Sequence, residues 1–238
     1  MQARQHRSIV ARWLQRLTLT CAIASAIALL LMVPPAQAGQ DVLTARSQQW
    51  PAWSLPAPLA RPGRRDLTYP DWCAGEWRVQ SSDGSSYAVR FRPSSAGVVG
   101  DRAFNAAAVG RAVLGERLNG VANDPANPNR QIAYLRSPDG QPLQLESTVV
   151  GRRRERPDPT LLLVDELALQ VLHGQGAPAV SRVETLSRFE LLNPDLIRVE
   201  QWQASYPTPA LGLTAQAQRS ERLELRLERS PPGSDPAS

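Results

Sequence analysis

Near the end of the chain, charged and apolar residues alternate over seven positions: Arg222-Leu223-Glu224-Leu225-Arg226-Leu227-Glu228. Leucine, glutamate and arginine favour helix intrinsically. A helix would nevertheless scatter these leucines around its circumference, whereas a strand places them all on one face. The alternation therefore predicts a strand that is buried on one side.

Three predicted hairpins precede this strand, and each has turn residues between two apolar or alternating segments. The paired segments are 77–80 with 87–91, 132–136 with 143–150, and 180–192 with 196–204. Residues 161–172 fit one face of a strand and also one face of a helix. We interpret them as a strand because two β segments follow. Residues 119–129 are rich in Asn and Pro and predict an irregular loop.

These segments amount to about nine short strands without a long amphipathic helix, which predicts an all-β fold, an antiparallel sandwich or an up-and-down barrel. A closed barrel would remove exposed strand edges. We place the β-barrel domain at residues 67–229 and a disordered Pro/Ser tail at 230–238. Residues 39–66 are rich in Pro. They predict an extended lead segment whose tryptophans contact the domain, or else a disordered linker.

The N-terminus has the pattern of a cleavable export signal. Residues 1–16 contain four arginines and no acid, an apolar run follows, and Ala36-Gln37-Ala38 resembles a cleavage site. We predict a signal peptide at residues 1–38. An uncleaved membrane anchor is the alternative, although the run is slightly short for a spanning helix and ends at two prolines.

Charge argues against nucleic-acid binding. The net charge is +5, and the four arginines of the signal contribute four of these charges, so the mature chain is near neutral. A nucleic-acid surface needs a persistent basic face. The chain also contains no lysine, which excludes Schiff-base chemistry on a lysine.

Few residues remain for catalysis or metal binding. After cleavage the chain keeps one cysteine, Cys73, which we expect to be buried, and one histidine, His173. That excludes an intramolecular disulfide and a zinc site of clustered His and Cys. A catalytic triad would need His173 with Asp165 or Glu166, and adjacent strand residues point to opposite faces. We predict no catalytic residues, metal or cofactor.

Residues 69–79 contain a pattern that resembles the start of a known protein family. They read Tyr-Pro-Asp-Trp-Cys-Ala-Gly-Glu-Trp-Arg-Val, and a Gly-x-Trp at the first strand resembles the opening of the lipocalin (calycin) family. The resemblance implies that Gly75 and Trp77 lie at the closed end of a lipocalin-like barrel. It also implies that an arginine from the last strand, Arg222 or alternatively Arg219, lies across the tryptophan.

The wider chain resembles an uncharacterised family of cyanobacterial and chloroplast proteins with lipocalin-like folds. The resemblance rests on Arg65-Asp66-Leu67-Thr68-Tyr69-Pro70, Gly100-Asp101-Arg102-Ala103-Phe104-Asn105 and Arg182-Val183-Glu184-Thr185. It implies that the mature protein is located in the periplasm or the thylakoid lumen.

Two non-enzymatic functions follow as expectations. The first is binding of a small hydrophobic ligand, such as a pigment, isoprenoid or lipid, inside the barrel. Its candidate contacts are Tyr87, Tyr134 and Trp202, each of which fits a core position equally well. The second is an assembly or interaction factor for a photosynthetic membrane complex. Its candidate contacts are Trp50, Trp53 and the run Arg152-Arg153-Arg154, which would otherwise be a solvated turn.

Overall fold

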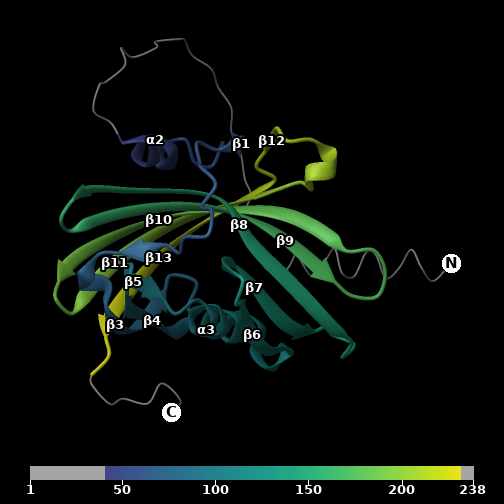
Figure 1. Cartoon of the computed structure of the whole chain (residues 1–238), viewed down its shortest axis with the longest axis horizontal. Helices are drawn as coiled ribbons and strands as arrows, with labels where there is room; N and C mark the ends of the chain where they lie inside the picture. The colour runs from purple at the N-terminus through teal and green to yellow at the C-terminus, as the bar shows by residue number, and fades with distance from the viewer. Residues whose placement is uncertain (1–40, 232–238) are drawn as a thin grey trace, which may run out of the picture. The chain divides into compact units, whose positions relative to one another are not determined.

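A computed structural model of the chain describes residues 41–231, and the alternating segments form one large antiparallel sheet there (Figure 1). Its eleven strands follow the order β2-β5-β4-β3-β13-β11-β10-β9-β8-β7-β6, and the sheet curls into a half-barrel. The all-β, up-and-down antiparallel prediction is confirmed. The strands are β2 (Thr68–Tyr69), β3 (Gly75–Ser81), β4 (Ser86–Ser94), β5 (Gly97–Gly100), β6 (Leu118–Asp124), β7 (Asn127–Arg136), β8 (Pro142–Asp158), β9 (Leu161–His173), β10 (Ala179–Asn193), β11 (Leu196–Tyr206) and β13 (Arg219–Arg229).

The remaining elements surround this sheet. A second, two-stranded sheet pairs β1 (Ser54–Leu55) with β12 (Ala215–Gln216). The helices are α2 (Val42–Gln48) and α3 (Arg102–Leu114), with the 3-10 turns η1 (Asp71–Cys73), η2 (Gly115–Arg117) and η3 (Pro209–Leu211). The predicted signal peptide and residues 232–238 of the predicted tail lie outside the described residues. No helix within residues 41–231 is long and apolar enough to cross a membrane.

Helix α3 lies where the half-barrel is open. Strands β2 and β6 stand at opposite ends of the strand order and do not pair with each other. The helix leads from β5 to β6 and contacts both β4 and β6 (Figure 1). It is rich in alanine, a strong helix former, and ends at Gly115 with a φ of +59°. Sequence reasoning missed this helix because its apolar residues form no clear stripe.

The three predicted hairpins and the last strand are confirmed, and residues 161–172 are strand as expected. Two local predictions are wrong. Residues 119–129 belong mostly to β6 and β7 rather than to an irregular loop. Proline is tolerated there because β7 pairs with β8 only from Arg130 onward, so the backbone at Pro128 is not paired with β8. The run Arg152–Arg154 lies within β8 rather than in a turn.

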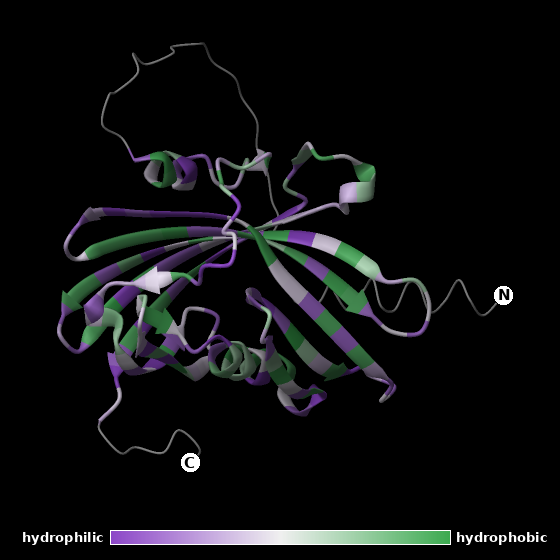
Figure 2. Cartoon of the chain, viewed as in Figure 1, coloured by the Kyte–Doolittle hydropathy of each residue, from purple (hydrophilic) through white to green (hydrophobic). Residues whose placement is uncertain are grey.

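The curled sheet has two distinct faces. We call inner the face of Leu162, Phe189 and Val199, which are cross-strand partners, and outer the face of Leu163 and Trp202. The inner face carries one core over β3, β4, β5, β11 and β13 and a smaller cluster on β9. The outer face carries another core over β9, β10 and β11. Figure 2 shows the resulting alternation of apolar and polar bands along the strands.

The lead segment covers the outer face instead of being disordered. Leu43 of α2 and Trp53 are fully buried against outer-face residues of β9, β10 and β11. The chain then passes the edge of β8, where Ala60 forms a bridge with Arg152, just beyond the last residue paired with β7. It reaches the inner face at Leu67, which packs against Leu162 and Val164 of β9. The prediction that the tryptophans contact the domain is confirmed.

Candidate functional site on the inner face

One end of the inner face is closed by aromatic side chains. Trp77 on β3 is fully buried, and its Nε1 donates a hydrogen bond of 2.8 Å to the carbonyl of Cys73 in η1. Tyr69 contacts Phe91 and Phe189 edge to face, with ring centroids 4.7 and 5.8 Å apart. These rings fill the interior between β2, β4 and β10, so this end is core.

An arginine of the last strand covers Trp77, as the resemblance implies, but it is Arg229 rather than Arg222. The Arg229 guanidinium lies 4.2 Å from the Trp77 ring centroid and donates a 2.9 Å hydrogen bond to the carbonyl of Ala74. Arg222 lies on the outer face, 5.7 Å from the Trp202 ring, because it alternates with the inward leucines of β13. Gly75 has a φ of +118°, which favours glycine, and a Cβ there would lie 2.8 Å from Nη1 at the flexible end of Arg229.

The other end of the inner face, formed by β6 to β9, carries an apolar row that is not part of a core. Its members are direct cross-strand partners and are all half-buried: Val121, Ala133, Leu145 and Leu172. None of them belongs to, or packs against, the three buried clusters of the described chain. An apolar surface left half-exposed on the concave side of a sheet is available for contact with another molecule.

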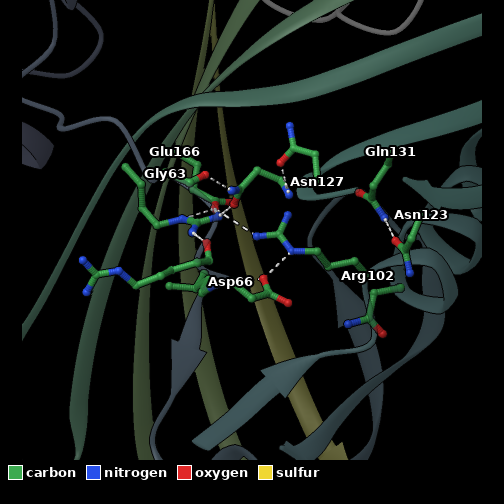
Figure 3. A network of polar contacts seen from close by, with 12 residues as sticks. Gly63, Asp66, Arg102, Asn123, Asn127, Gln131 and Glu166 are labelled. Atoms are coloured by element: carbon green, nitrogen blue, oxygen red, sulfur yellow. Dashed lines mark hydrogen bonds and ion pairs between the residues drawn. The ribbon is translucent and has the colours of Figure 1, made fainter. Parts of the chain in front are cut away.

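A polar row lies beside the apolar row, two residues further along each strand. It consists of Asn123, Gln131, Ser147 and Gln170. The Gln131 side chain donates a hydrogen bond of 3.2 Å to Asn123 Oδ1 (Figure 3). Polarity therefore changes from apolar to uncharged polar within about 7 Å along the strands.

Deeper along the strands, two arginines and two carboxylates form a balanced network (Figure 3). Arg102 of α3 contacts Asp66 at 2.7 Å and Glu166 of β9 at 3.3 Å. The Arg152 guanidinium contacts the same Glu166 oxygen at 2.6 Å and donates a 2.8 Å hydrogen bond to Asn129 Oδ1. Because each guanidinium is paired with a carboxylate, the network forms a polar floor with no surplus charge.

Helix α3 contacts β6 and β7, two of the strands that carry the apolar row. Val109 and Val113 lie about two and three turns after Arg102, on the same side of the helix. Arg102 reaches Glu166 on the inner face, so this side of α3 is directed at that face. Val109 and Val113 are 39% and 44% exposed, so both leave apolar surface accessible to solvent.

A hollow of about 290 Å³ lies at the polar end of this region. Its lining includes Asp66 and Arg102 of the network, Asn123 of the polar row, and Arg92 and Asp101. Arg92 and Asp101 form an ion pair of 2.8 Å. The hollow therefore offers charged and amide groups beside Val99, Pro125 and Pro128, and it adjoins the polar row at Asn123.

The predicted ligand contacts do not lie together. Tyr87 is half-buried and packs against the core at the closed end, and Trp202 is buried on the outer face beneath the lead segment. Tyr134 is 44% exposed on the outer face of β7, opposite Ala133 of the apolar row. These three residues were chosen because they are aromatic, and aromatic character does not show which face of a strand turns inward. The pairing register between strands decides that.

The predicted partner contacts are mostly internal. Trp53 is fully buried and donates a 2.7 Å hydrogen bond to the carbonyl of Arg46, and Trp50 is half-buried. Arg152 belongs to the inner network, and Arg153 pairs with Glu155 at 2.5 Å. Arg154 is the most exposed of the three arginines in the run.

The residues that a catalytic triad would need do not come together. Asp165 and Glu166 lie on opposite faces, as predicted, and His173 contacts Glu146 at 3.4 Å rather than either of them. Residues 41–231 hold no cluster of three or more His, Cys, Asp or Glu side chains placed to bind a metal ion. Cys73 is a buried free thiol, as expected.

Comparison with known proteins gives one family. Neither the curated proteins nor the solved structures contain a match to this chain. Residues 81–229, which span strands β4 to β13, match the model of a family described as a domain of unknown function, DUF6816. This match covers more than half of the 238 residues, and the chain therefore belongs to the DUF6816 family.

Proposed function

We propose that this protein binds a small amphipathic molecule on the inner face of the half-barrel and is exported to the periplasm or the thylakoid lumen. The observation that carries the proposal is the apolar row beside the polar row. Four half-buried apolar side chains outside every core lie next to hydrogen-bonding amides. A ligand with an apolar body and one polar end matches that order.

Three features support this orientation of the ligand. Val109 and Val113 of α3 add accessible apolar side chains on the helix that packs against β6. The polar hollow supplies space for the polar end of the ligand. The network around Glu166 is already neutral, so it favours an uncharged polar group over a strong anion or cation.

The first experiment is purification of the mature protein, residues 39–238, from its native host. An absorption spectrum and mass spectrometry of the organic extract would identify a stoichiometric pigment, isoprenoid or lipid. A determined N-terminus at Gly39 would test the predicted cleavage after Ala38. A protein that retains residues 1–38 would contradict cleavage after Ala38 and would favour the membrane-anchor alternative.

A matched pair of variants tests the location of the site. Leu172→Gln changes the apolar row, and Val171→Gln changes the adjacent residue on the outer face of the same strand. With Nile red as an uncharged fluorescent probe, we expect Leu172→Gln to weaken binding about tenfold, because it removes apolar contact. Val171→Gln should leave the affinity unchanged. Equal effects of both variants, or no saturable binding by the wild type, would refute the proposed site.

A further inference from the structure

A second surface on the molecule is free of charge and is unrelated to the inner face. Residues 47–60 of the lead segment and 207–218 after β11 contain no Asp, Glu, Lys, Arg or His. The two segments are joined through the β1–β12 pair and cover the outer side of the sheet (Figure 1). We call these two segments the uncharged cap.

Two leucines project from the uncharged cap. Leu211 and Leu213, in and just after η3, are 76% and 79% exposed, the two largest values among the exposed large apolar side chains of residues 41–231. Gly212 separates them with a φ of +120°, a backbone conformation that residues with a Cβ rarely adopt. The bend at this glycine keeps both leucines at the tip of the loop.

A buried arginine holds the loop in this conformation. Arg182 on β10 is 5% exposed and donates three hydrogen bonds to backbone carbonyls: Pro207 at 2.9 Å, Leu213 at 3.2 Å and Gly212 at 3.1 Å. The exposed leucines are therefore presented by an ordered loop. Little conformational entropy remains to be lost when they are buried against another surface.

The backbone of the loop is also largely satisfied within the chain. Besides the three carbonyls bonded to Arg182, the amides of Leu211 and Gly212 donate to the carbonyls of Thr208 and Pro209, each at 3.0 Å. Prolines at 207 and 209 have no amide hydrogen to satisfy. Each of these internal hydrogen bonds lowers the cost of moving the loop out of water.

We propose that the uncharged cap docks on a lipid bilayer by inserting Leu211 and Leu213 into its interfacial region. A bilayer fits these observations because its acyl boundary can take up the two leucines while its headgroup region accommodates the polar groups of the loop. Neither segment of the uncharged cap carries an ionic group that would be desolvated on insertion. The proposal does not depend on the inner-face ligand.

Vesicle binding tests the proposal directly. The chain from residue 39 onward, which contains all of the described structure, is mixed with phosphatidylcholine vesicles and sedimented. We expect binding that is unchanged between 0.05 and 0.5 M NaCl, because it depends on apolar burial rather than charge. Leu211→Ala or Leu213→Ala should each lower the partition coefficient about tenfold, and the double variant Leu211→Asp/Leu213→Asp should abolish sedimentation with vesicles.

Leu192→Asp is the matched control, because Leu192 is 46% exposed at the end of β10, outside the uncharged cap. It should bind vesicles like the wild type, and circular dichroism would confirm that all variants are folded. Three results would overturn the proposal. They are absence of wild-type binding to vesicles, equal loss in the Leu192 control, and analytical ultracentrifugation showing that the leucines instead join two copies of the chain.

Discussion

The guanidinium of Arg46 on α2 donates two hydrogen bonds to the carboxylate of Glu184 on β10, at 2.9 and 2.8 Å. The two side chains are 6% and 0% exposed. Arg46 also donates to the hydroxyl of Tyr206, whose own proton goes to Glu184 in a short hydrogen bond. This buried cluster ties the lead segment to the outer face.

Removing Arg46 should leave a buried carboxylate without its cation. We expect Arg46→Met to lower the free energy of unfolding by about 3–5 kcal/mol, measured by urea denaturation. Arg226→Met is the control, since Arg226 pairs with Glu228 at the surface, where such pairs contribute about 0–1 kcal/mol. A loss below about 1 kcal/mol for Arg46→Met would show that the lead segment does not depend on this ion pair.

Asp165 should make stability depend on pH. It is fully buried and its carboxyl oxygens have no hydrogen-bond partner among the described side chains and backbone. Burial, and then the neighbouring Glu184, raise the pKa of Asp165 well above its usual value. A raised folded-state pKa favours the protonated folded form, so this contribution is complete below pH about 4 and is lost as the pH rises through the folded-state pKa.

Asp165→Asn replaces the titrating carboxyl group with an amide of nearly the same size. We expect the stability of the wild type, relative to this variant, to fall as the pH is raised from 4 toward the folded-state pKa. Urea denaturation at several pH values measures the difference. A constant difference across that range would mean that Asp165 titrates normally in the folded protein.

Gly75→Ala should destabilise the closed end of the half-barrel. Gly75 has a φ of +118°, and its added Cβ would meet Arg229 at 2.8 Å. We expect a loss of about 1–3 kcal/mol. Gly84→Ala is the control for backbone strain alone, because Gly84 also has a positive φ but has nothing within 4 Å of its Cβ position. Equal losses in thermal denaturation would exclude the contact with Arg229 as the cause.

The Cys73 thiol should be unreactive in the folded protein. Cys73 is fully buried beside Trp77, and burial raises its pKa far above the ordinary thiol value. Because the thiolate is the reactive form, labelling with a disulfide reagent should be slow in buffer and fast in denaturing urea. Rapid labelling of the native protein would indicate local opening of η1.

The strands could be predicted from the sequence, but the residues of the candidate site could not. The alternation in 222–228 and the Asp-Gly turns are local, so they identified β13 and the hairpins without knowledge of neighbours. The Gly-x-Trp pattern likewise placed Gly75 and Trp77 correctly at the start of β3, packed at the closed end. The same patterns could not place Tyr134, because which strand face turns inward depends on the curl of the whole sheet.

The sequence by itself determined the period-two strands and their turns, because these depend on residues close together along the chain, and it determined the near-neutral charge of residues 39–238 by composition alone. Only the tertiary structure decided that Arg229 rather than Arg222 covers Trp77, and that Arg102 and Arg152 meet at Glu166. It also decided that the apolar and polar rows lie side by side. Each of these contacts joins residues far apart in sequence, and strand register and the packing of α3 and the lead segment bring them together.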